Sequence, residues 1–132
     1  MKLELVMVPV TDVDRAKEFY EKVGFRTDHD QVVSDDVRFV QMTPPGSACS
    51  IAFGKGLTKM EPGSLDNMQM VIADADATHA DLVARGIDVS EVDELAWGRF
   101  VFFADPDGNG WALQQLPDWS TSAGGEGYDP EA

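Results

Sequence analysis

The chain has 132 residues, of which 43% are hydrophobic and 26% charged, and these values are typical of one globular domain. Its 24 acidic and 10 basic residues give a formal net charge of -14, which disfavours binding to nucleic acid or to an anionic membrane. No apolar run reaches the roughly 18 residues of a membrane span, and the N-terminus does not have the pattern of a signal peptide, so we expect a cytoplasmic protein. The single cysteine, Cys49, excludes an internal disulfide and a cysteine-based zinc site.

The chain contains an internal repeat. Residues 8–14, with the sequence VPVTDVD, resemble residues 70–76, with the sequence MVIADAD, and the offset of 62 also aligns Gly24 with Gly86. Each copy has an apolar strand, an Asp-x-Asp helix start that favours capping, about ten helical residues, and a glycine that can end the helix in the left-handed conformation. The repeat therefore predicts two copies of one structural unit.

Three short strands are expected after each helix, from their apolar runs and from the turn residues between them. They are residues 25–29, 37–42 and 50–54 in the first copy, and 89–92, 99–104 and 111–116 in the second. The prediction is an α+β fold of two β-α-β-β-β modules related by pseudo-twofold symmetry, in which a concave mixed sheet can hold a ligand. We expect one domain over residues 1–116, with modules at 1–55 and 66–116, a linker at 56–65 and an acidic tail at 117–132.

Two motifs at the ends of this unit carry a resemblance to a known family. The opening residues 8–12, followed by Phe19-Tyr20 and Gly24-Phe25, and the closing sequence FADPDGN at residues 103–109 resemble the vicinal oxygen chelate superfamily. That superfamily includes glyoxalase I, extradiol dioxygenases, fosfomycin-resistance enzymes and bleomycin-resistance proteins. The resemblance covers about residues 2–116 and implies the fold, but it does not imply one reaction, since the fold hosts several chemistries and some members are not enzymes.

The resemblance also implies where a metal would bind. Enzymes of the superfamily hold one divalent metal with four side chains, usually His and Glu, two from each module. The equivalent positions here are Leu5, Ala52, Asn67 and Ala112. Leucine and alanine have no donor atom in the side chain, and asparagine alone is a poor ligand for a transition metal. We therefore expect no metal and no other cofactor.

Strand alternation predicts which side chains face the hollow between the modules. We expect a ligand-binding site lined by Met7, Asn67, Gln69, Ala112 and Gln114, with Trp97, Phe100 and Phe102 as aromatic walls. A hollow of this composition is neutral, and its two glutamine amides can each donate and accept hydrogen bonds. The alternative interpretation is that the aromatic residues belong to the ordinary core of the strands.

Two kinds of function fit these residues. The first hypothesis is a metal-free protein that binds a small molecule of an aromatic or drug-like kind, as the resistance members of the superfamily do. The alternative is an enzyme of the same superfamily, a lyase, isomerase or dioxygenase with an unidentified substrate, and a metalloenzyme with ligands at other positions is a further form of it. The resemblance also implies a homodimer, in which an isologous contact would cover exposed strand edges.

Overall fold

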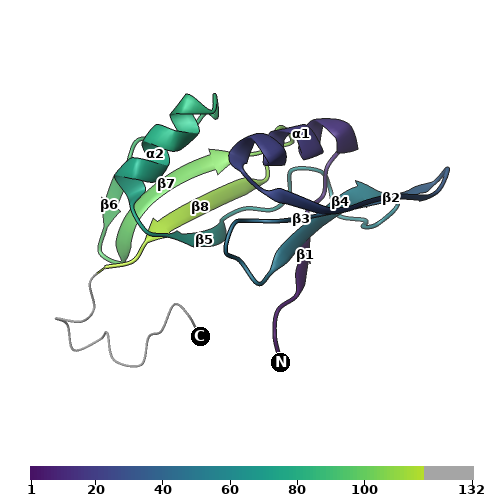
Figure 1. The fold of residues 1–132 in the computed structure, drawn as a ribbon, viewed down its shortest axis with the longest axis horizontal. Coiled ribbons are helices and arrows are strands. Elements are labelled where there is room, and N and C mark those ends of the chain that lie inside the picture. Colours follow the sequence, from purple (N-terminus) through teal and green to yellow (C-terminus); the bar gives the residue numbers. More distant parts are fainter. Residues whose placement is uncertain (118–132) are drawn as a thin grey trace.

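The computed structural model describes residues 1–117, and these residues form two β-α-β-β-β modules (Figure 1). The first module consists of β1 (Leu5–Met7), α1 (Val13–Val23), β2 (Arg26–Ser34), β3 (Val37–Thr43) and β4 (Ser50–Lys55). The second consists of β5 (Met68–Ile72), α2 (Ala75–Ala84), β6 (Asp93–Leu95), β7 (Gly98–Ala104) and β8 (Gly110–Gln115). The predicted α+β order is confirmed. The expected acidic tail lies outside the described residues, apart from Pro117.

Each module has its own four-stranded mixed sheet. The strand order is β1-β4-β3-β2 in the first sheet and β5-β8-β7-β6 in the second, and in each sheet only the first pair is parallel. Met7 lies opposite Ala52 in the first sheet, and Gln69 lies opposite Ala112 in the second. Met7 and Gln69 are 62 positions apart, and Ala52 and Ala112 are 60 positions apart, because the second module is two residues shorter between these strands. The repeat therefore extends to the strand register, since equivalent residues lie opposite equivalent partners.

The two helices begin in the same way. The carboxylate of Asp12 accepts a hydrogen bond from the Arg15 amide at 3.0 Å, and that of Asp74 accepts one from the Ala77 amide at 3.1 Å. After α1 the chain turns at Gly24, where φ is 118°, a conformation that costs glycine little. In residues 1–117 no helix is long and apolar enough to cross a membrane.

The modules pack on each other through the helix-covered faces of their sheets. Figure 1 shows α1 and α2 above the two sheets. The ring of Trp111 on β8 lies 6.0 Å from Tyr20 on α1 and 5.7 Å from Phe25, and Phe103 on β7 lies 5.9 Å from Phe19. One hydrophobic core therefore spans both modules. The opposite face of each sheet, here called the outward face, points away from this core.

A buried polar network connects the modules inside the core. The carboxylate of Asp105 accepts hydrogen bonds from the Tyr20 hydroxyl at 2.8 Å and from the Asn109 side-chain amide at 2.8 Å. The Asn109 amide also donates to the carbonyl of Pro9 at 2.8 Å, and Trp111 Nε1 donates to the Tyr20 hydroxyl at 3.0 Å. Burial and the nearby Asp105 carboxylate raise the pKa of Tyr20. The DPDGN motif at residues 105–109 is thus hydrogen-bonded to Pro9 and Tyr20 of the first module.

One predicted strand was wrong. Residues 89–92 were expected to form the second strand of the second module, but β6 covers Asp93–Leu95 instead. Ser90 lies beside β7, where its amide donates to the carbonyl of Phe102 at 2.9 Å and its hydroxyl accepts from the Phe102 amide at 2.9 Å. A side-chain oxygen therefore replaces a backbone carbonyl, and regular pairing begins three residues later, at Asp93.

Candidate functional site

The outward face of the second sheet holds most of the predicted site residues. The register places Gln69, Ala112 and Phe102 side by side across β5, β8 and β7. Gln114 and Phe100 lie opposite each other in the next row. Residues opposite each other in neighbouring strands point to the same face, so these five side chains lie together.

The other three predicted residues lie at the edges of this group or away from it. Trp97 is in the turn between β6 and β7, and its side chain is 57% exposed. Asn67 precedes β5 in the left-handed conformation, with φ of 61°, and is exposed. Met7 lies on β1, in the other sheet, opposite Ala52. A site that includes Met7 therefore needs residues from both sheets.

Two glutamine side chains form a hydrogen-bonded chain on this face. The amide nitrogen of Gln114 donates to the main-chain carbonyl of Trp97 at 2.7 Å. The amide nitrogen of Gln69 donates in turn to the amide oxygen of Gln114. Gln114 is buried, whereas Gln69 is exposed. The chain therefore runs from the Trp97 carbonyl through the buried Gln114 to an amide at the surface.

The aromatic residues of the face differ in how far a ligand could reach them. The rings of Phe100 and Phe102 are nearly parallel, with an interplanar angle of 6° and 5.8 Å between centroids. Phe100 is 4% exposed and Phe102 is half-buried, so the Phe100 ring supports that of Phe102. Ala112, between Gln69 and Phe102, is only 1% exposed. The accessible groups are therefore Trp97, Phe102 and the Gln69 amide.

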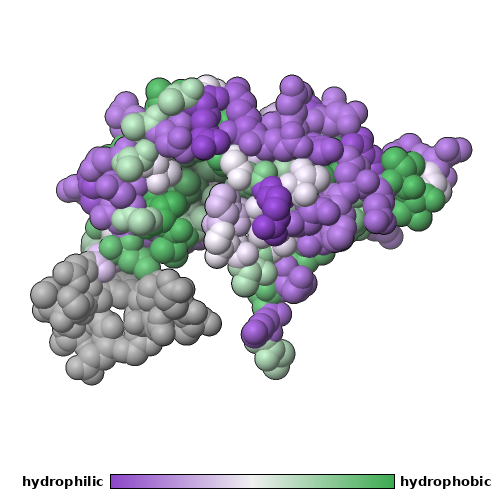
Figure 2. All heavy atoms as spheres, viewed as in Figure 1, coloured by the Kyte–Doolittle hydropathy of each residue, from purple (hydrophilic) through white to green (hydrophobic). Residues whose placement is uncertain are grey.

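Further exposed apolar side chains continue this surface. Val71 on β5 is 54% exposed and Leu95 on β6 is 38% exposed. Figure 2 shows hydrophobic residues beneath the second module, and others at the tip of the β2–β3 hairpin, where Val32 and Val33 are exposed. Apolar side chains gathered at the surface often mark a place where a ligand or a partner binds.

The first sheet carries a different polar chain on its outward face. The hydroxyl of Thr43 donates to the carboxylate of Asp28 and lies 2.7 Å from the hydroxyl of Ser50. The Thr43 hydroxyl and the Arg26 guanidinium hold the pKa of Asp28 below its usual value. The register is irregular between Thr27 and His29. Simple alternation could not predict that Asp28 points toward Thr43, so this group is absent from the predicted site residues.

The positions that hold the metal in enzymes of this fold do not fit a metal ion here. Leu5, Ala52 and Ala112 have no donor atoms, and both alanines are buried. The amide of Asn67 would be the single side-chain ligand among the four positions. In residues 1–117, no three His, Cys, Asp or Glu side chains lie close enough together to hold a metal ion.

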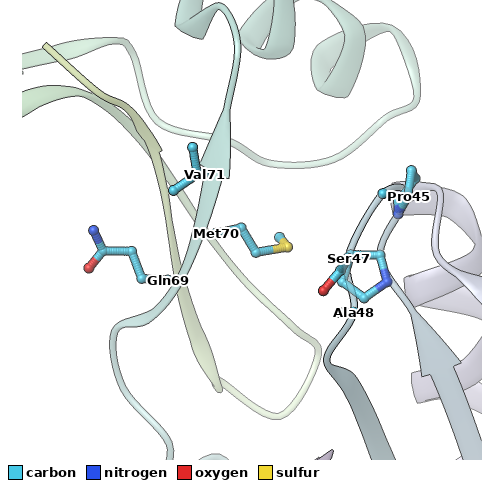
Figure 3. Close-up of a pocket in the computed structure, with 8 residues that line it drawn as sticks. Pro45, Ser47, Ala48, Gln69, Met70 and Val71 are labelled. Atoms are coloured by element: carbon cyan, nitrogen blue, oxygen red, sulfur yellow. The ribbon is translucent and has the colours of Figure 1, made fainter. Parts of the chain in front are cut away.

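Two cavities lie where the modules meet. One, of about 390 Å³, is bounded by residues 44–48 and by β5, and Figure 3 shows Met70 pointing toward that loop while Gln69 points away. The other, of about 270 Å³, is mostly apolar and includes Cys49 and Met68. Burial and the charge of Glu4 raise the pKa of the Cys49 thiol, which is the opposite of an activated nucleophile. Of the predicted site residues, only Gln69 lines these two cavities.

Known proteins are similar to this chain in sequence and fold. The sequence profile of the Glyoxalase/Bleomycin resistance protein/Dioxygenase superfamily matches residues 2–113. The crystal structure of TnmS3, an antibiotic binding protein from Streptomyces sp. CB03234, is 37% identical and has a TM-score of 0.80, with 89% of this chain and 97% of that chain covered.

Two more relatives agree with this match. A glyoxalase/bleomycin resistance protein from the same Streptomyces strain is 38% identical with a TM-score of 0.75, covering 86% of this chain and 100% of that chain. The protein YetH of Bacillus subtilis is 27% identical over 113 residues, which are 83% of this chain and 94% of YetH. The profile match covers most of the chain and agrees with the two-module fold. The protein therefore belongs to the glyoxalase/bleomycin resistance/dioxygenase superfamily.

Proposed function

We propose that this protein binds a small aromatic or drug-like molecule without a metal, in the manner of a resistance or sequestration protein. The observation that carries the proposal is the outward face of the second sheet. There the half-buried Phe102 lies in one row with Gln69, beside the row of Gln114, and the exposed Trp97 follows at the β6–β7 turn, where its main-chain carbonyl accepts from Gln114. Similarity to a protein described as antibiotic binding supports the same function.

The chemistry of this face suits binding better than catalysis. Aromatic side chains bury a large area of a flat ligand and stack on it, whereas a few fixed polar groups orient it. The central side chains of the face, Gln69, Val71, Phe100, Phe102, Ala112 and Gln114, include no group that exchanges a proton near neutral pH, and the carboxylate of Asp93, opposite Phe100, lies at the margin on the edge strand β6. The four positions equivalent to metal ligands cannot hold a metal ion, so no bound metal would act as a Lewis acid in place of a general acid or base.

We also propose that two copies of the chain pair through their outward faces. Within residues 1–117, Gln69 and Val71 of this face are exposed, and the outer edges of β1 and β5 have no neighbouring strand in their sheets. A second copy would cover these edges and bring the Met7 face of the partner toward the amides, which would deepen the site. Light scattering should give the mass of a dimer at micromolar concentration. A monomer mass that persists when ligand is added would contradict this part of the proposal.

The experiment that tests the binding function is calorimetric titration of the metal-free, chelator-treated protein with planar aromatic compounds, including 2-naphthol. We expect binding that Trp97→Ala weakens about tenfold or more, since truncation of an aromatic contact residue commonly costs more than 1 kcal/mol. Val32→Ala is the matched control, because Val32 is an exposed apolar residue of the other module, and it should bind as the parent does.

Two outcomes would contradict the proposal. Equal affinity in the parent and in Trp97→Ala would place the site elsewhere. Binding that appears only after addition of nickel, zinc, manganese or iron would overturn the metal-free function.

A further inference from the structure

The orientation of the amide chain determines which hydrogen-bonding group it presents to a ligand. A main-chain carbonyl can only accept, so the Gln114 side chain must direct its nitrogen toward Trp97 and its oxygen toward Gln69. The Gln114 oxygen likewise accepts only, so Gln69 must direct its nitrogen toward Gln114. The Trp97 carbonyl thus determines which end of each amide is the oxygen and which is the nitrogen, for Gln114 and for Gln69.

The free end of the chain is the amide oxygen of Gln69. Within residues 1–117 no donor group forms a hydrogen bond with this oxygen, and the residue is exposed. Each amide in a chain polarises the next, so an amide whose N–H donates becomes a stronger acceptor at its oxygen. The same polarisation weakens the remaining N–H of Gln69 as a donor. The glutamine chain therefore offers a ligand mainly an acceptor.

The acceptor and the accessible aromatic group are arranged for one flat ligand. Gln69 on β5 and Phe102 on β7 occupy one row, separated by Ala112 on β8. Two strand spacings are about 9–10 Å, so a ring that stacks on Phe102 would bring its edge toward the Gln69 oxygen. Ala112 lies between them and is buried, and its side chain is a single methyl group, so it does not obstruct a flat ligand that spans from Phe102 to Gln69.

We propose that the ligand is a planar aromatic molecule with a hydrogen-bond donor on its edge, such as a phenolic hydroxyl or a ring N–H, and that Gln69 is the residue that selects it. This inference rests on the proposed function and adds the class of ligand. A compound that presents only an acceptor at that edge would place two oxygens against each other, and it would leave the Gln69 oxygen without a partner.

The test compares two probes of nearly the same shape, 2-naphthol and 2-methoxynaphthalene, by titration calorimetry. Methylation of the oxygen removes the donor and keeps the aromatic rings. We expect the parent to bind 2-naphthol about tenfold more tightly, which is the effect of one net hydrogen bond. Gln69→Leu should bind both probes with similar affinity. Gln114→Leu, which frees Gln69 to rotate, should reduce the preference, whereas Gln31→Leu on the exposed part of β2 should leave it unchanged.

The outcomes separate the inference from the function on which it rests. Equal binding of the two probes by the parent, with the loss in Trp97→Ala retained, would overturn the donor requirement and leave the binding function in place. A preference that survives in Gln69→Leu would assign the selection to another residue. If neither probe binds, the proposed function fails, and this inference fails with it.

Discussion

The turns that join the last two strands differ between the two modules. In the second module the β7–β8 turn begins at Asp105, which bonds to Tyr20 of the first module at 2.8 Å. Counting from the paired strand residues, the equivalent position in the first module is Pro44, which has no side-chain polar atom and lines the cavity beside β5. One copy of the turn therefore joins the modules, and the other leaves a cavity at their junction.

The outward faces of the two sheets diverge in a related way. The polar chain of the first face ends in the carboxylate of Asp28, whose charge is held by Thr43 and Arg26. That of the second face contains only neutral amides. Burying a charged carboxylate under an apolar ligand costs far more than covering a paired amide. The second face is therefore the better surface for an apolar ligand.

Replacing Asp105 should produce the largest loss of stability. Asp105→Ala removes the acceptor for the Tyr20 hydroxyl, for the Asn109 side chain and for two main-chain amides of the turn. We expect a loss of about 3–5 kcal/mol in the free energy of unfolding, because each buried donor that is left without an acceptor costs about 1–3 kcal/mol. Urea denaturation measures it. The matched change Pro44→Ala should cost less than about 1 kcal/mol, and equal losses in the two variants would refute the difference between the turns.

The second prediction concerns Tyr20 and has a pH dependence. Tyr20→Phe should cost about 1–2 kcal/mol at pH 7, because it removes one hydrogen bond to Asp105 and one from Trp111. In the native protein the pKa of the phenol is raised above its ordinary value of 10.0. Its contribution to stability is therefore complete below pH 10 and is lost as the pH rises above that value, when the unfolded phenol ionises and the folded one does not.

The measurement is urea denaturation of the parent and of Tyr20→Phe from pH 7 to pH 11. The difference in stability between the two proteins should shrink or change sign at the alkaline end, because the variant has no phenol at this position. A constant difference across this range would mean that the Tyr20 phenol ionises as readily in the folded protein as in the unfolded one.

The sequence alone predicted the repeated part of the fold well. The 62-residue offset, the Asp caps and the glycines after the helices depend on local chemistry, and the order of elements followed from them. The start of β6 did not follow from local chemistry, because the hydroxyl of Ser90 takes the place of a main-chain carbonyl where the chain meets Phe102 of β7. Hydrophobic periodicity does not indicate that a side-chain hydroxyl accepts a main-chain hydrogen bond, and it does not indicate the irregular register near Asp28.

The candidate site could be predicted only in part, for a similar reason. Alternation correctly placed Gln69, Ala112 and Gln114 on one face, since side-chain direction is a property of a single strand. Alternation could not indicate that Ala112 is almost fully buried. It also could not place Met7 relative to that face, because their separation depends on how two whole modules pack.

The smallest expected effect comes from a pair of arginines that the repeat retains. On β3, Arg38 bonds to Asp30 and to Asp14 of α1, and on β7, Arg99 bonds to Asp76 of α2 and to Glu94. In the first cluster the side chains of Arg38 and Asp30 are 21% and 24% exposed and that of Asp14 is 82% exposed. In the second cluster Arg99 is 31% exposed, and both of its carboxylate partners are exposed, at 68% and 74%. Water therefore screens the second cluster more.

Arg38→Met should accordingly lower the free energy of unfolding by up to about 1 kcal/mol, and Arg99→Met should lower it by less. Hydrogen bonds from Arg38 and Lys17 lower the pKa of Asp30 to about 2, so the contribution of this cluster is present above pH 3.8 and is lost as the pH falls toward 2. Urea denaturation at pH 7 and at pH 3, in about 0.05 M and about 1 M salt, measures both effects. Because both low pH and high salt weaken the Arg38 cluster, they should bring Arg38→Met closer to the parent. An Arg99→Met loss as large as that of Arg38→Met would show that exposure does not set the strength of these repeated ion pairs.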